Sequence, residues 1–493
     1  MQPTSEQQAI IDAAKSTTDN ILISALAGSA KTTTLEMIAK ALTQEPILSV
    51  AFNKKIADEM AKRLPPHVVS KTINALGHGI WYNATGRKLV IDTKKNYNLW
   101  KEVFETLKGS DKRDTPFAEI LQSISRAKNM GYIPPSHVYA NRSLVTRDQF
   151  AESFDEEPEP FWLDLIDQVM NKSIAESYRG NIDFDDQVYC SALLGGTFPR
   201  YPLVLVDETQ DLSLLNHAFL QKLVAKRIIA VGDRNQAIYA FRGALSNSMD
   251  ELKRSFSMTE KTLTISFRCP RSVVREAQTL VPSMQWPEWA IEGEVRHWGE
   301  WNSSSIPEGA AVICRANAPL FRLAMSLLRQ GRGCTIVGRD IGPGLIKTLK
   351  GLGSEQMDQA SALKAIAKWE AEKKSKSRAK ASIEDRAESL RVFVAVGKNL
   401  SEAITYADHL FKQEGPVLLM TGHKAKGLEY DDVIFLDSWR IPSKWAESEE
   451  DIKQEQNISY VIMTRAKKTL TYANLDSFVE EQHGKDWAKA ANG

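Results

Sequence analysis

The sequence predicts an α/β protein with two parallel-sheet domains, each interrupted by a mostly helical insertion. Short apolar runs alternate with stretches of helical periodicity, which is the pattern of parallel sheets covered on both faces. The runs form two clusters along the chain, and the segments between them carry helical periods and few strand signals. At about 150 residues per domain, a chain of 493 residues is long enough for this organisation.

Each strand is expected at one apolar run. The first cluster holds Ile21 to Ile23, ILSVAF (47–52), LVLVDE (203–208) and IIAVGD (228–233). The second half repeats the pattern at TLTI (262–265), AAVIC (310–314), VLLMT (417–421) and DVIFLD (432–437). We therefore predict a first sheet domain over 1–80 and 179–262 with a helical insertion at 81–178, and a second over 263–350 and 416–493 with a helical insertion at 351–415.

Composition excludes several classes of protein. Lys and Arg total 63 and Asp and Glu total 62, so the chain has no overall basic field, and any contact with nucleic acid must come from a local groove. Four scattered cysteines without CxxC spacing predict neither a disulfide framework nor a zinc site. No apolar run approaches the roughly 20 residues of a membrane span, and the N-terminus does not read as a signal peptide. We expect a cytoplasmic protein without a membrane partner.

A candidate phosphate-binding loop follows the first strand. The stretch ALAGSAKTT (25–33) runs from a strand through small residues to Lys31 and Thr32 and then into a helix. Backbone N–H groups and a helix N-terminus bind phosphate oxygens, while the Lys reaches the β- and γ-phosphates and the hydroxyl binds Mg²⁺. Ala25 and Ala30 stand at the two glycine positions of the strict pattern, so by itself the stretch is also compatible with an ordinary helix start.

A second acidic segment strengthens this interpretation. In LVLVDETQD, a buried strand ends at Asp207 and Glu208. An acid in this position holds Mg²⁺, and its neighbour orients or deprotonates the attacking water. The two features in this order predict a nucleoside triphosphatase with Thr32 and Asp207 at the metal.

With these motifs in place, the chain resembles the UvrD/Rep/PcrA-like superfamily 1A DNA helicases. The resemblance covers most of the chain in order and extends to segments of both halves. These are TSEQQAII, AFNKKIADEMAKRL (51–64), DFDD (183–186), VGDRNQAIYAFRGA (231–244), SFRCP (266–270), CRANAPLFR (314–322), TGHKAKGLEYDDVIFLD (421–437) and YVIMTRAKKTL (460–470). The resemblance implies two RecA-like domains with ATP between them.

The resemblance also implies roles at the ATP site. Gln7 is similar to an adenine-reading glutamine, Phe267 to a residue that stacks on adenine, and Glu429 to a ribose-contacting acid. The loop residues Ala25, Ala27, Gly28, Ser29, Ala30, Lys31, Thr32 and Thr33 would hold the phosphates. Gln236 suits the sensing of a γ-phosphate, and Arg268 and Arg465 offer forked donors to the developing phosphoryl charge.

A single-stranded DNA groove is implied as well. Single strands bind by base stacking on aromatic residues, with cations along the backbone. By resemblance, the groove residues are Phe52, Lys54, Thr72, Tyr239, Phe241, Arg242, Thr421 and His423. We expect ATP and Mg²⁺ as cofactors, single-stranded and tailed duplex DNA as substrates, and 3′→5′ movement. A partner protein of repair, replication or a nuclease is also expected.

Two departures from the family pattern keep other functions open. Ala30 replaces the glycine before Lys31, and the second insertion is short for the family. They motivate an alternative in which the chain is an ATP-gated, DNA-sensing subunit of a nuclease or defence complex with little unwinding. RNA as the track is a weaker alternative, because no RNA-recognition motif is apparent.

Overall fold

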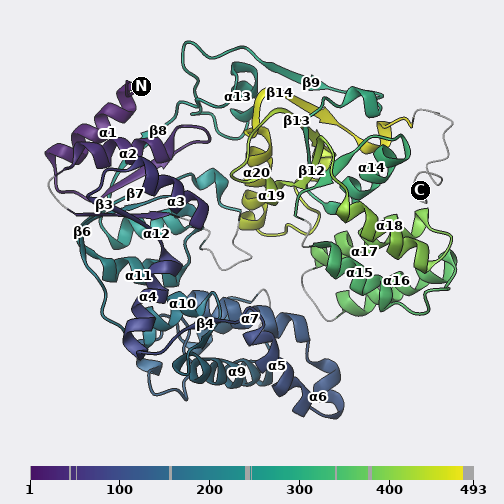
Figure 1. Ribbon diagram of the computed structural model, residues 1–493, viewed down its shortest axis with the longest axis horizontal. Coiled ribbons are helices and arrows are strands. Elements are labelled where there is room, and N and C mark those ends of the chain that lie inside the picture. The colour runs from purple at the N-terminus through teal and green to yellow at the C-terminus, as the bar shows by residue number, and fades with distance from the viewer. Residues whose placement is uncertain are drawn as a thin grey trace. The chain divides into compact units, whose positions relative to one another are not determined.

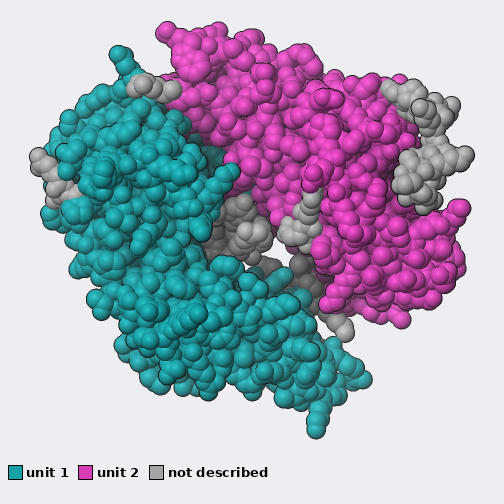
Figure 2. All heavy atoms as spheres, in the orientation of Figure 1, with its two compact units in different colours: residues 1–26, 30–263 teal, residues 27–29, 264–493 magenta. Residues whose placement is uncertain are grey.

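A computed structural model describes most of the chain as two compact units. The described residues are 2–43, 46–51, 53–154, 158–238, 245, 247–338, 341–375 and 380–480, without the side chain of Asp114. Unit 1 holds residues 1–26 and 30–263, and unit 2 holds residues 27–29 and 264–493. Figure 1 traces the elements and Figure 2 colours the two units.

Unit 1 is built on a six-stranded sheet in which every neighbouring pair is parallel. Its order is β3-β2-β6-β7-β1-β8. The strands are β1 (Ile21–Ala25), β2 (Ile47–Ala51), β3 (Val68–Thr72), β6 (Tyr201–Val206), β7 (Val224–Gly232) and β8 (Thr259–Leu263). The apolar runs become central strands because their side chains are buried on both faces of the sheet.

Helices cover both faces of this sheet. One face packs against α1 (Ser5–Ser16), α2 (Lys31–Ala41) and α3 (Lys54–Arg63). The other face shares one continuous core with the helices of the predicted insertion. The remaining helices of unit 1 are α4 (Ile73–Thr85), α5 (Lys95–Thr106), α6 (Gly109–Asp114), α7 (Phe117–Met130), α8 (Arg147–Glu152), α9 (Pro160–Tyr178), α10 (Asp186–Tyr189), α11 (Leu214–Leu223) and α12 (Ser248–Ser255). A short parallel pair, β4 (Val90–Ile91) and β5 (Asn181–Ile182), closes the helical segment.

Unit 2 repeats the architecture with a second six-stranded parallel sheet. Its order is β11-β12-β10-β13-β14-β9. The strands are β9 (Glu294–His297), β10 (Ala311–Cys314), β11 (Cys334–Ile336), β12 (Val417–Thr421), β13 (Tyr430–Leu436) and β14 (Ala466–Ala473). The helices are α13 (Arg271–Ala277), α14 (Asn317–Arg329), α15 (Ile341–Lys350), α16 (Gln359–Lys374), α17 (Lys380–Val396), α18 (Leu400–Lys412), α19 (Gly422–Ala425) and α20 (Glu449–Met463). Helices α15–α18 pack together and share a core with the sheet.

The structure confirms the α/β class with parallel sheets and corrects one strand. TLTI (262–265) was expected with the second cluster, but β8 ends at Leu263 and pairs with β1 in the first sheet. An apolar run shows that a strand exists, but the choice of sheet depends on pairing that the run does not encode. Strands β3, β9, β11 and β14 were not predicted, because they are short, lie at or next to a sheet edge, or carry lysines. The five domain boundaries stay predictions.

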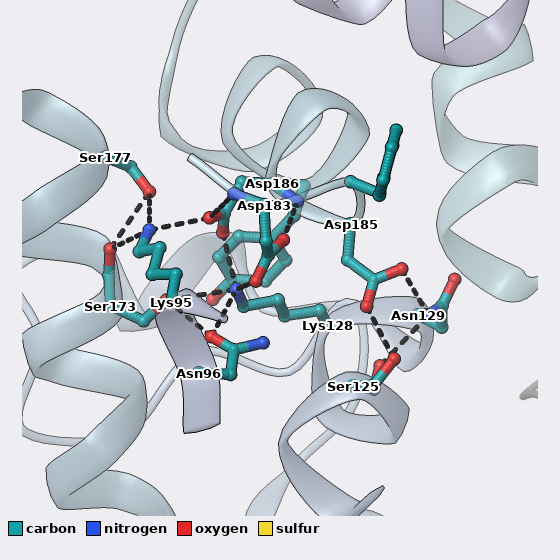
Figure 3. Close-up of polar contacts among 12 residues, drawn as sticks. Lys95, Asn96, Ser125, Lys128, Asn129, Ser173, Ser177, Asp183, Asp185 and Asp186 are labelled. Atoms are coloured by element: carbon teal, nitrogen blue, oxygen red, sulfur yellow. Dashed lines mark hydrogen bonds and ion pairs between the residues drawn. The ribbon is translucent and has the colours of Figure 1, made fainter. Parts of the chain in front are cut away.

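A buried ionic cluster holds the helical part of unit 1 together (Figure 3). Lys128 on α7 lies 2.6 Å from Asp183 and 2.7 Å from Asp186, and Lys95 on α5 lies 2.6 Å from Asp186. The Lys95 ammonium group also donates to the Ser173 carbonyl on α9 at 2.7 Å. Three helices are thereby tied to the DFDD turn. Burial alone raises the pKa of Asp186, but the two ammonium groups outweigh it and lower that pKa to about 2.

We predict that Asp186→Ala lowers the free energy of unfolding of unit 1 by about 3–5 kcal/mol, because it leaves buried ammonium groups without their counterion. The contribution of Asp186 is present above about pH 4, its unfolded pKa, and is lost as the pH falls toward 2. Denaturant unfolding across this pH range measures it. Asp164→Ala, which removes an exposed partner of Arg147, is the control and should cost under about 1 kcal/mol. Equal losses in the two variants would contradict the assignment.

Candidate active site

The loop between β1 and α2 has the shape of a phosphate cradle. The loop is fastened at its start, where Leu26 N donates to Leu263 O at 2.9 Å, and α2 begins at Lys31. The hydroxyl of Ser29 is buried and has no hydrogen-bond partner among the described residues. Because a buried hydroxyl without a partner is costly, this group suits an oxygen-rich ligand.

Ala30 adopts the conformation that the missing glycine would have supplied. Its φ is 59° and its ψ is 42°, in the left-handed region, and it stands immediately before α2. An alanine in this region costs roughly 1–2 kcal/mol. The Ala30 carbonyl still accepts from Thr34 N at 2.9 Å, as in a regular first helical turn. The loop therefore keeps the glycine geometry at an energetic cost.

The acidic end of β6 meets the start of α2. Thr32 Oγ1 donates to Asp207 Oδ2 at 2.7 Å, and Lys31 Nζ lies 3.6 Å from Glu208 Oε2. The carboxyl ends of neighbouring parallel strands meet at one sheet edge, which explains how residues 175 positions apart come together. The structure thus brings four of the predicted ATP-site residues into one cluster of unit 1.

Electrostatics at this cluster favour a cation. Burial and, after it, the neighbouring Glu208 carboxylate raise the pKa of Asp207 to about 6, although Lys31 and the Thr32 hydroxyl act in the opposite direction. Burial likewise raises the pKa of Asp233. Neighbouring carboxylates repel each other when both are ionised, and a bound cation would offset that repulsion. Mg²⁺ prefers oxygen ligands of this kind. Thr32 and Asp207 therefore fit the predicted metal role.

A side-chain relay extends the cluster to β7, and sequence reasoning missed two of its members. Gln210 Nε2 donates to Glu208 Oε2 at 2.5 Å, and Gln210 Oε1 accepts from Asp233 N at 3.0 Å. Asp233 in turn accepts from Gln236 Nε2 at 2.7 Å. Gln210 and Asp233 therefore connect the predicted base, Glu208, to the predicted sensor, Gln236. Both lie inside quoted motifs, but only the pairing of β6 with β7 shows that they touch.

Gln7 has a structural role in this conformation. Its side-chain Oε1 accepts from Thr4 N at 3.0 Å in a capping box at the start of α1. Its Nε2 donates to Thr34 Oγ1 at 3.0 Å on α2. Both ends of the amide are thus engaged by protein groups next to the loop. Adenine reading by Gln7 stays a prediction.

In unit 2, the segments that carry the two predicted arginines contact the same neighbouring stretch of chain around Glu429. Arg268 Nε donates to Glu429 Oε2 at 2.7 Å, and Arg268 Nη1 donates to the Thr464 carbonyl at 3.4 Å. Arg465 is buried, and its guanidinium donates to the carbonyls of Val461 and Leu428. Three of the predicted residues of unit 2, Arg268, Glu429 and Arg465, therefore belong to one cluster.

The tip of the loop, residues 27–29, packs within unit 2. Phe267 N donates to Gly28 O at 2.9 Å, and Ala27 N donates to Tyr460 Oη at 3.0 Å. Gly28 has a φ of 73°, and an added Cβ would lie 2.6 Å from Ser266 Oγ and 2.7 Å from Arg268 Cβ. A glycine is therefore required at this close approach. Tyr460 is a further contact that the sequence analysis did not single out.

The predicted DNA residues are distributed over several strand ends. Lys54 is exposed at the start of α3, and Thr72 caps α4 by accepting from Ala75 N at 3.1 Å. Thr421 ends β12 and His423 follows on α19. Phe52, Tyr239, Phe241 and Arg242 lie outside the described residues. The DNA-contact roles of these residues stay predictions.

The DFDD turn presents an aromatic residue that the sequence analysis did not single out. Phe184 is 57% exposed, although its neighbours Asp183 and Asp186 are buried. Its carbonyl accepts from Asn74 Nδ2 at 2.9 Å, which ties the turn to α4. In the sequence, an aromatic residue flanked by acidic residues does not by itself indicate whether its ring is exposed. Its exposure emerges only when the acids turn inward to the two lysines.

Comparison with known proteins decides the family. The family model described as UvrD/REP helicase N-terminal domain matches residues 4–257, about half of the chain. The chain belongs to the UvrD/REP helicase family. Unit 1 of this UvrD/REP family member carries nearly all of the matched range.

Several curated proteins are similar to this family member. F-box DNA helicase protein 1 of Schizosaccharomyces pombe is 25% identical over 95% of this chain and 57% of its own length. A protein named probable DNA helicase II homolog, from Rickettsia conorii, is 22% identical over 93% of this chain and 90% of its own length. ATP-dependent DNA helicase PcrA of Leuconostoc citreum is 24% identical over 56% of this chain and 40% of its own length. The chain thus spans roughly half of the first of these relatives and less of the last.

Two kinds of feature are not found among the described residues. None of the helices in the described ranges is long and apolar enough to cross a membrane. Within the same ranges, no group of three or more His, Cys, Asp or Glu side chains is arranged to hold a metal ion. A site at Thr32 and Asp207 would need oxygen ligands from its nucleotide and from water.

We predict that Ala30→Gly raises the free energy of unfolding by about 0.5–1 kcal/mol, because relief of the left-handed strain exceeds the added flexibility of glycine. ATPase activity should stay similar or increase. Denaturant unfolding and steady-state hydrolysis measure the two effects. A loss of stability together with a collapse of hydrolysis would show that the alanine is required.

We also predict that Asp207→Asn stabilises the protein in the absence of Mg²⁺ and nucleotide, and increasingly so at higher pH. The folded pKa of about 6 lies above the unfolded value, so the folded state binds the extra proton and the Asp207 contribution falls as the pH rises from about 4 to 6. A difference of two pKa units corresponds to about 2–3 kcal/mol. Unfolding of both proteins from pH 4 to 8 gives the comparison, and a pH-independent difference would refute the assignment.

Proposed function

We propose that this protein is an ATP- and Mg²⁺-dependent translocase on single-stranded DNA that separates duplexes, moving 3′→5′. The cluster of Lys31, Thr32, Asp207 and Glu208 is the observation that carries the proposal. It combines a helix N-terminus, a cation, a buried acid and a second, partly exposed acid beside it, which are parts that phosphoryl transfer uses. Membership of the UvrD/REP helicase family and the names of the relatives support DNA as the track.

Each residue of the cluster has a role in this proposal. Lys31 binds the β- and γ-phosphates, and the Ser29 hydroxyl donates to a phosphate oxygen, which satisfies a buried group. Thr32 and Asp207 would hold Mg²⁺, which would neutralise charge on the phosphates. Glu208 orients the attacking water and accepts its proton, and Gln236 reports the γ-phosphate through Asp233 and Gln210.

The arginines of unit 2 complete the proposed chemistry. Arg268 exchanges its contact with Glu429 for the γ-phosphate, and Glu429 then turns to the ribose. Arg465 adds a second guanidinium to the developing charge. Since both arginines belong to unit 2 and Lys31 belongs to unit 1, ATP binding would couple the units, and hydrolysis would release them.

On the DNA side, we propose that Lys54, Thr72, Thr421 and His423 contact the strand, together with the aromatic residues of the same motifs. Phe184 joins them as a stacking residue, because it is exposed and held on a rigid turn. A strand that shifts by about one base in each ATP cycle would produce directed movement.

The test compares wild type with Lys31→Ala, Glu208→Gln and Lys40→Ala. Lys40 is an exposed lysine of the same helix α2 and serves as the control. We expect the first two changes to lower DNA-stimulated ATPase and forked-duplex unwinding about 100-fold or more, because each removes transition-state stabilisation or the general base. Lys40→Ala should resemble wild type.

Two outcomes discriminate the alternatives. ATPase that responds to DNA without unwinding of the duplex would favour the ATP-gated DNA-sensing subunit. If RNA stimulates the ATPase more strongly than a DNA strand of matched sequence, the track is RNA and not DNA. Full activity in Lys31→Ala would reject the proposed ATP site.

A further inference from the structure

Unit 1 contains a pocket of about 880 Å³ whose lining includes none of the predicted ATP-site or DNA-contact residues. One face of α4 lines it together with Lys71, Tyr139, Tyr178 and residues 194–201 except Arg200, and we call it the α4 pocket. All of these segments belong to unit 1. Its volume falls within the roughly 300–1,000 Å³ that is typical of pockets that hold a ligand.

The wall that α4 contributes is made of small residues. Ala75, Gly79 and Asn83 follow one another at every fourth position and line the pocket. A glycine inside a helix is destabilising relative to alanine, and at Gly77 packing explains it, because an added Cβ would lie 2.2 Å from Gln187 O. At Gly79 an added Cβ would meet no heavy atom within 4 Å. Contacts of the described residues therefore do not explain Gly79, whereas an open pocket does.

Much of the remaining wall is aromatic, and it is held against α4. Tyr178 packs edge-on against Trp81, with 5.0 Å between ring centroids. The segment 194–199 approaches α4 at Gly196, where an added Cβ would lie 2.4 Å from Ile80 Cγ2. These contacts fix the aromatic wall in place.

Positive charge gathers at the α4 pocket. Lys71 lines it directly. Arg142 lies over the ring of Tyr139, 4.4 Å from its centroid, and Lys222 lies 5.3 Å from the centroid of Phe198. Within the described ranges, no Asp or Glu lines the pocket and none of the three cations pairs with a carboxylate. Burial lowers the pKa of Lys222, and the nearby Arg142 lowers it further, so an anion bound here would offset unfavourable charge.

This arrangement fits an acidic peptide better than a strand of nucleic acid. A single strand stacks successive bases on separate ring faces along a groove. Here the rings share one pocket, and cations already cover one face of Tyr139 and one face of Phe198. An acidic segment with one large apolar side chain matches both features, because that side chain fills the pocket while the carboxylates meet the cations.

We propose that the α4 pocket is a docking site for an acidic peptide segment of a partner protein. An aromatic or large aliphatic side chain of the peptide enters over Gly79, and neighbouring carboxylates pair with Lys71, Arg142 and Lys222. The site adds a binding function to unit 1 that depends neither on ATP hydrolysis nor on movement along DNA.

Fluorescence anisotropy on the full chain tests the docking site. The probe is a fluorescein-labelled peptide in which one phenylalanine lies between two pairs of aspartates. Matched peptides carry glycine in place of the phenylalanine, or lysines in place of the aspartates.

Two variants change the pocket in different ways. Gly79→Leu fills it and favours the helical state of α4, so weaker binding in this variant does not arise from unfolding. Lys71→Glu reverses a charge in the lining. The matched controls are Gly79→Ala, which adds only a methyl group, and Lys364→Glu, which reverses an exposed charge on α16 of unit 2.

We expect saturable binding of the aspartate–phenylalanine peptide that weakens as the salt concentration rises. Gly79→Leu and Lys71→Glu should each weaken it about 10-fold, and both controls should stay within about twofold of wild type. The glycine peptide should bind about 10-fold more weakly, and the lysine peptide should not compete. Thermal unfolding should show Gly79→Leu to be at least as stable as wild type.

Equal peptide affinity in Gly79→Leu and wild type would overturn the docking site, as would a lack of saturable binding to wild type. If both variants weaken binding of oligo(dT) and leave the peptide unaffected, the pocket belongs to DNA and the proposal fails. The peptide assay uses neither ATP nor DNA, so its failure is distinct from failure of the proposed helicase. DNA-stimulated ATPase in Gly79→Leu should equal that of wild type.

Discussion

The hydrogen bond from Thr32 Oγ1 to Asp207 Oδ2 marks the constraint on which the candidate site depends. It joins the start of α2 to the end of β6 and holds an acid in a buried position where ionisation is unfavourable. A parallel sheet makes this possible, because all of its carboxyl ends share one edge. The lysine, the hydroxyl, the acid pair and the Gln210 relay then meet without long or flexible connections.

Strain and burial are concentrated at this edge. Ala30 and Glu208 both have positive φ, and Asp207 and Asp233 are both buried acids with raised pKa. Such costs persist where the surrounding structure holds them in place, and they are typical of sites that bind a charged ligand. By contrast, the ionic cluster around Lys128 satisfies its buried charges internally, so it holds helices together and leaves Phe184 exposed.

Aromatic residues are used in two ways in this chain. Most pack in the cores of the two units, such as Trp81 and Trp100. Trp289 and Phe184 instead lie exposed on turns that backbone and ionic contacts hold in place. A rigid exposed ring can stack on a base with little loss of side-chain entropy, which suits the proposed nucleotide ligand and the proposed track, since both carry nucleobases.

The sequence by itself determined the α/β class, most central strands and the residue types of the candidate ATP site. Continuous apolar runs report burial on both faces, and Lys31-Thr32 and Asp207-Glu208 stand directly beside their elements. The tertiary structure decided the sheet to which β8 belongs, the left-handed backbone of Ala30 and the relay through Gln210 and Asp233. It also decided the exposure of Phe184 and Trp289. These features depend on pairing and packing between distant segments, and a local pattern carries no information about which segment lies opposite.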